Sequence, residues 1–401
     1  MLDHTQSAYD TQEPEESDNI IAGMKICFWG EIAGALKGKP LGGGEKQIAL
    51  LAKALVKAGH EVIYVDYTVA NDYISEEGIK VCGVKGYDGG IKILRNLTTR
   101  LRLLYKSLKD KKADVYYCRI RDFRHILVYW AARAVKAKFV FGIAADLDVL
   151  GLKERLKYLY FTDVWNSWWF INGVFSEIVY PFLLRNSDLV LVQHEGQKKI
   201  LSEKHIESTV FLNLIEPPEN SEINSGEGND FVYVGALDKR KGFKSLYELI
   251  EITPDQSFKI IGEPRDRTAS HLFGKLKSFK NVKLLGTLPH SETYSQIASS
   301  RALISTSPRE GFPNIFLEAW SAGIPVLSMY VDPGDVIKNN KLGIVANGSL
   351  DTLAKALKDP GASDGFKYRA QKYIQENHVL NGRKIEEISS LFMSLMNNDN
   401  M

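Results

Sequence analysis

Residues 42–66 read GGGEKQIALLAKALVKAGHEVIYVD, and this order of residue types decides the fold class. A glycine-rich loop leads into apolar residues at helical spacing between Glu45 and Gly59, and the apolar strand Glu61–Asp66 follows. The short apolar run Met24–Trp29, ahead of the loop, predicts a buried first strand. Strand, helix and strand in this order predict a right-handed crossover between two parallel strands.

The same alternation extends along the chain on both sides of one polar segment. Residues 215–229 hold two prolines and two glycines among polar residues, which is typical of a linker. The further strand candidates are Val115–Cys118, Phe139–Ile143, Leu189–Val192, Phe231–Val234, Phe258–Ile261, Val282–Leu285, Ala302–Ser305, Pro325–Leu327 and Gly343–Val345. Because 401 residues suffice for two domains, we predict an α/β protein of two doubly wound, Rossmann-like domains facing each other across a cleft.

The charge distribution divides the chain further. Residues 1–23 carry six acidic and no basic residues, which predicts a disordered tail. Residues 24–214, the expected N-terminal domain, hold 29 Lys and Arg against 20 Asp and Glu, although the whole chain has a formal charge of only +2. Residues 230–375 form the expected C-terminal domain and residues 376–401 a last helix. We expect anionic partners for the first domain, either phosphate groups or a membrane surface, and no nucleic acid.

The composition excludes several classes of protein. Hydrophobic residues make up 44% and charged residues 25% of the chain, as in ordinary globular proteins. Its three cysteines lack the spacing of disulfide scaffolds or zinc modules, which favours a reducing compartment. Neither a long apolar run nor a signal-peptide pattern is present, so we expect a cytoplasmic protein. The glycines of residues 30–44 do not match the G-x-G-x-x-G pattern, which argues against a dehydrogenase.

The segment that carries the chemistry is residues 307–328, SPREGFPNIFLEAWSAGIPVLS. Pro313 suits the first turn of a helix, which places Glu310 just before the helix and Glu318 one to two turns inside it. Exposed amides at a helix start carry a partial positive charge that favours an anion. Taken alone, the two glutamates could equally be solvated residues at a helix end.

This pattern resembles the E-x7-E motif of retaining glycosyltransferase family 4, the glycosyl transferases group 1. The resemblance continues in chain order from about residue 24 to residue 375. Residues 42–66 resemble the first glycine loop, helix and second strand of that family. The remaining matching segments are Asn186–Gln193, Phe231–Gly242, Ile260–Glu263 and Leu284–Leu288.

The resemblance implies a GT-B fold, transfer with retained anomeric configuration, no obligatory metal and no cofactor, since the nucleotide-sugar is a substrate. It implies that Glu310 contacts the donor sugar, Glu318 the ribose and Lys241 the diphosphate. Lys241 belongs to a Lys-Arg-Lys cluster that could also be a solvated surface turn. The other residues implied to bind the donor are Gly43, Gly44, Gly235, Gly262, Glu263, Thr287, Gly311, Phe312, Pro313 and Asn314.

One departure from the family pattern concerns the diphosphate. The family commonly has an arginine where this chain has Ala236, so a second cation must come from elsewhere. Arg240 is one candidate, and Arg119 and Arg121, at the end of a first-domain strand, are two others. These two arginines could instead bind the acceptor, or form a salt-bridged loop.

A second departure concerns the acceptor. Ala144 and Ala145 stand where many family members have a histidine. Asp146 or Asp148 could take a polar role there, Asp146 in catalysis and Asp148 in acceptor binding. These two residues also form a D-x-D, the metal signature of the other large glycosyltransferase fold, but two α/β halves argue against that fold and against a metal site.

Two segments suggest contact with a membrane. Residues 91–112 place leucines on one helical face and basic residues on the others, and residues 158–184 are rich in aromatic side chains, including Trp168 and Trp169. Either segment could equally pack within the first domain. We expect a peripheral enzyme on the cytoplasmic membrane face.

The sequence therefore predicts a retaining glycosyltransferase that builds a cell-surface polysaccharide or glycolipid on a glycan or lipid-linked acceptor. A GT-B nucleotide-sugar epimerase and a catalytically weak GT-B partner protein remain alternatives.

Overall fold

The computed structural model describes residues 23–36, 42–89, 99–151, 154, 167–216, 228–361 and 364–397, and every structural statement below concerns these residues. The acidic tail, most of the linker, residues 91–98 and residues 155–166 lie outside this set, and the side chains of residues 167–172 are not described either.

The first domain is built on an eight-stranded sheet in the order β3-β4-β2-β1-β5-β6-β7-β8. All neighbouring strands are parallel except β3 and β4, which pair antiparallel at one edge. The strands are β1 Lys25–Trp29, β2 Glu61–Asp66, β3 Tyr73–Ile74, β4 Lys80–Gly83, β5 Val115–Arg119, β6 Lys138–Gly142, β7 Leu189–Val192 and β8 Thr209–Val210. The helices are α1 Ala33–Leu36, α2 Gly43–Lys57, α3 Thr99–Asp110, α4 His125–Ala134, α5 Asp146–Val149, α7 Ser167–Asn186 and α8 Glu195–Ser202.

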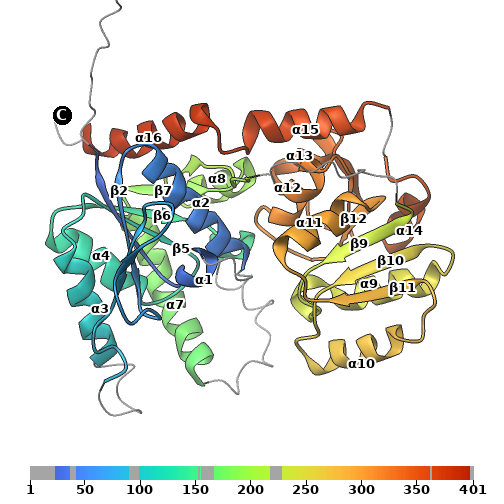
Figure 1. Cartoon of the computed structure of the whole chain (residues 1–401), viewed down its shortest axis with the longest axis horizontal. Coiled ribbons are helices and arrows are strands. Elements are labelled where there is room, and N and C mark those ends of the chain that lie inside the picture. The colour runs from blue at the N-terminus through green and yellow to red at the C-terminus, as the bar shows by residue number, and fades with distance from the viewer. Residues whose placement is uncertain are drawn as a thin grey trace, which may run out of the picture.

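The second domain has a fully parallel six-stranded sheet in the order β11-β10-β9-β12-β13-β14. Its strands are β9 Asp230–Val234, β10 Ser257–Ile261, β11 Val282–Gly286, β12 Ala302–Ser305, β13 Val326–Ser328 and β14 Gly343–Val345. Its helices are η2 Lys239–Lys241, α9 Phe243–Ile252, α10 Arg267–Leu276, α11 His290–Ala298, α12 Asn314–Ser321, η3 Pro333–Asp335, α13 Val336–Asn339, α14 Leu350–Lys358 and α15 Phe366–Asn377. Figure 1 shows the two sheets in two lobes, which is the GT-B architecture.

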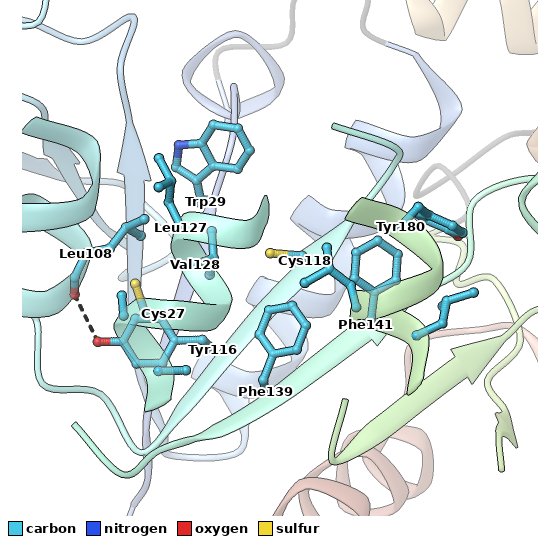
Figure 2. Close-up of a cluster of buried hydrophobic side chains, with 14 of the residues drawn as sticks. Cys27, Trp29, Leu108, Tyr116, Cys118, Leu127, Val128, Phe139, Phe141 and Tyr180 are labelled. Atoms are coloured by element: carbon cyan, nitrogen blue, oxygen red, sulfur yellow. Dashed lines mark hydrogen bonds between the residues drawn. The ribbon is translucent and has the colours of Figure 1, made fainter. Parts of the chain in front are cut away.

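Each sheet is buried on both faces because alternate side chains of a strand point to opposite sides. In β1, Cys27 and Trp29 enter one apolar cluster while Ile26 and Phe28 enter the cluster on the other face. Figure 2 shows the first cluster, where the Tyr116 hydroxyl donates to the Leu108 carbonyl oxygen at 2.9 Å. Helices therefore cover both faces of each sheet, and the ends of the strands remain to build a site.

The end of the chain returns to the first domain. Helix α15 packs in the second domain, whereas α16 (Gly382–Asn397) buries Ile388 and Phe392 in a first-domain cluster. Figure 1 shows the two helices along one edge of the molecule, spanning both lobes. The segment between α15 and α16 lies beside the start of the linker that leaves the first domain, because the Ile215 amide donates to the His378 carbonyl oxygen at 2.9 Å. The chain thus passes between the two domains twice, at neighbouring places.

The basic helix α3 corrects one expectation. Its Leu104 and Leu108 are fully buried in the first-domain core, and Leu101 packs against the same cluster. The leucine face of α3 therefore packs within the first domain, which is one of the two alternatives that the sequence left open. Arg102 and Lys106 are exposed to solvent. No helix among the described residues is long and apolar enough to cross a bilayer.

Candidate active site

Helix α12 begins where the sequence predicts. Pro313 occupies the N-cap position with φ −65°, and the helix runs from Asn314 to Ser321. Glu310 lies in the loop before it, and Glu318 lies in the helix with its side chain only 7% exposed. The loop follows β12, so it stands at the carboxyl end of the second sheet, the edge where open α/β sheets bind ligands.

Glu318 is held by residues of both domains. Its Oε1 lies 2.7 Å from Lys46 Nζ, on the first turn of α2, and 3.0 Å from His290 Nε2, at the start of α11. Burial alone raises the pKa of the Glu318 carboxyl. The His290 hydrogen bond and the Lys46 charge more than offset burial, so this pKa lies below its ordinary value. Glu318 is therefore an anion at neutral pH.

Glu310 is paired within the second domain. Its carboxylate forms an ion pair with Lys241 Nζ. Lys241 is fixed at its backbone, because its amide donates to the N-cap carboxylate of Asp238 at 3.0 Å and its carbonyl oxygen accepts from Thr306 Oγ1 at 3.1 Å. The structure thus brings Lys241, Glu310 and Glu318 to one edge of the second domain.

The first domain meets this edge directly at Gly311. A Cβ on Gly311 would lie 1.9 Å from the side-chain amide of Gln193 and 3.0 Å from the Ala144 carbonyl oxygen. A larger residue would therefore displace the Gln193 side chain and crowd the Ala144 carbonyl oxygen. This close approach is a physical reason for glycine after Glu310.

Asn314 connects the two domains by hydrogen bonds. Its Nδ2 donates to the Gly43 carbonyl oxygen at 3.0 Å, and its Oδ1 accepts from Gln47 Nε2 and Asn213 Nδ2, both at 3.1 Å. Asn213 is buried, and its Nδ2 also donates to the Phe312 carbonyl oxygen at 2.8 Å. The first turn of α2 therefore faces the first turn of α12. Gly43 and Gly44 are helical residues of that first turn, whereas the sequence suggested a loop.

The other predicted donor residues lie at neighbouring strand ends. Gly235 follows β9 and Gly262 follows β10, and a Cβ on Gly262 would lie 1.9 Å from the Gly235 carbonyl oxygen. Gly262 also has φ +141°, a conformation that L side chains rarely adopt. Glu263 and Thr287 are exposed beside these glycines. The donor roles of these residues stay predictions, but the fold gathers them at one edge.

The candidate second cations are engaged elsewhere. Arg240 binds Asp238 Oδ2 at 2.7 Å and is 61% exposed. Arg119 is buried and donates to Asn213 Oδ1 at 3.0 Å. Arg121 pairs with Glu177 of α7 at 2.5 Å, the salt-bridged arrangement that the sequence left open.

The two aspartates after β6 differ in their contacts. Asp148 is buried, and its Oδ2 accepts from the amides of Ala144 and Ala145 at 3.2 and 2.9 Å, so it orders its own loop. Asp146 Oδ1 lies 2.9 Å from His194 Nε2, and it accepts from Gln197 Nε2 at the same distance. The acceptor role of Asp148 and the catalytic role of Asp146 remain predictions.

Sequence reasoning missed Lys46, His290, Asn213 and Gln47. Lys46 and Gln47 follow the selected Gly43 and Gly44 with only Glu45 between them, so their place near the start of α2 was the available signal. His290 and Asn213 carry no local pattern, because only the tertiary fold brings them to α12.

Comparison with known proteins gives a family match for the second domain. Residues 217–376 match the family model described as glycosyl transferases group 1.

The second domain of the chain is thus similar to the group 1 glycosyltransferases.

Among curated relatives, one component of the human phosphatidylinositol N-acetylglucosaminyltransferase is 24% identical over 339 residues, which cover 79% of this chain and 65% of that protein. The lipopolysaccharide 1,6-galactosyltransferase of Salmonella typhimurium is 32% identical over 161 residues, which cover 38% of this chain and 40% of that protein. The chain spans 40–65% of the length of the curated relatives it matches.

Solved structures share the GT-B fold of this chain. Sucrose-phosphate synthase from Thermosynechococcus elongatus superposes with a TM-score of 0.71 at 15% identity, covering 94% of this chain and 100% of that one. Anabaena HepE in complex with UDP and glucose superposes with a TM-score of 0.65 at 14% identity, covering 92% of this chain and 100% of that one.

Proposed function

We propose that the protein is a retaining glycosyltransferase that moves a sugar from a nucleotide-sugar to a glycan or lipid-linked acceptor in the synthesis of a cell-surface polysaccharide or glycolipid. The observation that carries the proposal is that the loop before α12 holds the Glu310–Lys241 pair and α12 holds the Glu318–Lys46 pair, with Gly311 between the glutamates against the first domain. The family match and the UDP and glucose in the HepE structure support a nucleotide-sugar as donor.

The arrangement suits the charge changes of the reaction. Cleaving the bond between sugar and phosphate leaves a nucleoside diphosphate with growing negative charge. The Lys241 ammonium and the amides at the start of α12 offset that charge, and removing one such donor typically costs about 3–4 kcal/mol in the transition state. Glu310 orients the sugar hydroxyls and Glu318 the ribose hydroxyls. The proposed transfer uses no metal and no cofactor.

A thermal-shift screen against UDP-, GDP-, ADP- and TDP-sugars tests the donor. A ligand that binds the folded state raises its apparent stability by mass action. We expect one base to give a clear shift and Glu318→Ala to remove it. No shift with any of the four would contradict the proposal. Isomerised sugar without an acceptor would identify an epimerase, and binding without transfer to any acceptor would identify a weak partner protein.

We propose that the acceptor is met at an anionic membrane on the cytoplasmic side. Helix α7 exposes Phe175, Ile178 and Phe182 on one face, and Trp130 of α4 is also exposed. The excess of basic residues in this domain complements anionic lipid. Three buried free thiols, Cys27, Cys82 and Cys118, support a reducing compartment.

Liposome flotation tests the membrane contact. We expect the wild type to float with vesicles that contain phosphatidylglycerol and the triple variant F175S/I178S/F182S to stay in the soluble fraction. Tyr368→Ser, at an exposed aromatic on α15, is the matched control and should float. Equal flotation of the triple variant and the wild type would refute this surface.

A further inference from the structure

Lys46 of the first domain contacts Glu318 of the second domain, the carboxylate that we assign to the donor ribose. It stands on the first turn of α2, and its Nζ lies 2.7 Å from Glu318 Oε1 and 2.9 Å from His290 Nε2. The Lys46 side chain is 31% exposed, while that of Glu318 is 7% exposed. Solvent therefore reaches part of the Lys46 side chain, whereas Glu318 is buried.

The surroundings of Lys46 favour an anion. Its helix begins at Gly43, whose carbonyl oxygen accepts from Asn314 Nδ2 at the start of α12. Two helix starts from different domains thus lie together, and each carries a partial positive charge. Lys46 adds a full positive charge to this place, and in the structure the carboxylate of Glu318 is the anion that pairs with it.

The candidate cations chosen from the sequence pair with other residues in the structure. Arg240 points to Asp238, Arg119 to Asn213 and Arg121 to Glu177. Ala236 supplies no charge where the resemblance expects one. A nucleoside diphosphate carries more than one negative charge, so Lys241 alone leaves part of it uncompensated.

We infer that Lys46 is the second cation of the donor diphosphate and that Glu318 holds it in the ligand-free protein. When the donor binds, its ribose hydroxyls donate to Glu318 and the Lys46 ammonium moves to the phosphate oxygens. The exchange is feasible because the buried Glu318 carboxylate keeps His290 and gains the ribose hydroxyls as partners, while Lys46 gains a strong charge-assisted bond to phosphate. The first domain then contributes directly to donor binding. This inference rests on the proposed function.

Binding of a nucleoside and its diphosphate to matched variants tests the inference. Isothermal titration uses the base selected by the thermal-shift screen, for example uridine and UDP. We expect Lys46→Met to weaken diphosphate binding by about tenfold or more and nucleoside binding by less than about twofold. Lys46→Arg should restore most of the diphosphate affinity. Lys53→Met changes another lysine of α2, one that pairs with Glu77 and Glu216, and it should match the wild type.

Two results would overturn the inference. If Lys46→Met weakens nucleoside binding and diphosphate binding equally, Lys46 acts only through Glu318. If neither affinity changes, Lys46 takes no part in donor binding. Should Lys46→Met fail to fold, as judged by its unfolding temperature without ligand, Lys46→Gln serves as the neutral variant. A wild type that binds no diphosphate refutes the proposed function itself, whereas a binding wild type with an unaffected Lys46→Met refutes only the role of Lys46.

Discussion

The two glutamates of the E-x7-E segment sit in different kinds of environment. Glu310 pairs with Lys241, and both belong to the second domain. Glu318 pairs with Lys46 of the first domain and with His290 of the second. Glu310 is thus paired within one domain, whereas Glu318 has one partner in each domain. On the proposed roles, the sugar is bound by one domain and the nucleotide by both.

The largest expected effect belongs to the pair within the second domain. Lys241→Met should lower the rate of sugar transfer by about 100- to 1000-fold, because one cation on the leaving group is worth about 3–4 kcal/mol. The rate is measured with the donor selected by the screen. Lys244→Met, which removes an exposed pair to Glu248 on α9, is the control and should transfer at the wild-type rate. A Lys241→Met enzyme with the wild-type transfer rate would show that the Lys241–Glu310 pair takes no part in the transfer step.

The pair between the domains should act on binding instead. We expect Glu318→Gln to weaken nucleoside diphosphate binding by about tenfold, because the amide keeps the shape but loses the charge that accepts the ribose hydroxyls. Glu310→Gln should bind the diphosphate within about twofold of the wild type and lose transfer activity. Titration calorimetry measures both variants, with Glu376→Gln, exposed on α15, as the control. The comparison between the two glutamates fails if Glu310→Gln shows the greater loss of affinity.

The junction itself should be sensitive to acid. Burial lowers the pKa of His378 to about 4, and this histidine lies between the Asn213 carbonyl oxygen and the Tyr373 hydroxyl. The unfolded chain takes up the proton near pH 6.5 and the folded chain only near pH 4, so stability falls as pH drops through this window. The loss from His378 is about 2 kcal/mol at pH 5.

Chemical unfolding at pH 7 and pH 5 measures this loss. His378→Gln should reduce the difference between the two pH values by about that amount. His205→Gln, at an exposed position of the first domain, should leave the difference unchanged. An identical pH dependence in the His378 variant and the wild type would show that His378 does not sense acid.

The smallest expected effect concerns Asn314. Asn314→Ala removes hydrogen bonds to Gly43, Gln47 and Asn213, and should cost about 1–2 kcal/mol of stability. It should also raise the KM for the donor more than it lowers kcat, since it loosens closure and leaves the charged groups in place. Asn377→Ala, whose side chain bonds within α15, is the control. A lower kcat with unchanged KM would place Asn314 in the chemical step.

The sequence predicts much of this fold because the signals are local. Apolar runs such as Met24–Trp29 and Phe258–Ile261 are buried on both faces of parallel sheets, and they coincide closely with β1 and β10. Pro313 also marks the start of α12 correctly. The short edge strands β3 and β8, of two residues each, carry too little pattern to be recognised.

The contacts between the domains could not be predicted from the sequence, for a physical reason. Glu318 and Lys46 are 272 residues apart, and no periodicity encodes a contact of that kind. The return of α16 is similar, since an apolar face at Ile388 and Phe392 fits any complementary surface. Leucines of α3 illustrate the converse, because an amphipathic pattern does not distinguish a membrane from the domain's own core.

A crystal structure with the nucleoside diphosphate chosen by the screen tests the central claim most directly. The account predicts phosphate oxygens at Lys241 and at the first turn of α12, with ribose hydroxyls on Glu318. A nucleotide bound away from α12, or one that leaves the Glu310–Lys241 and Glu318–Lys46 pairs untouched, would contradict it.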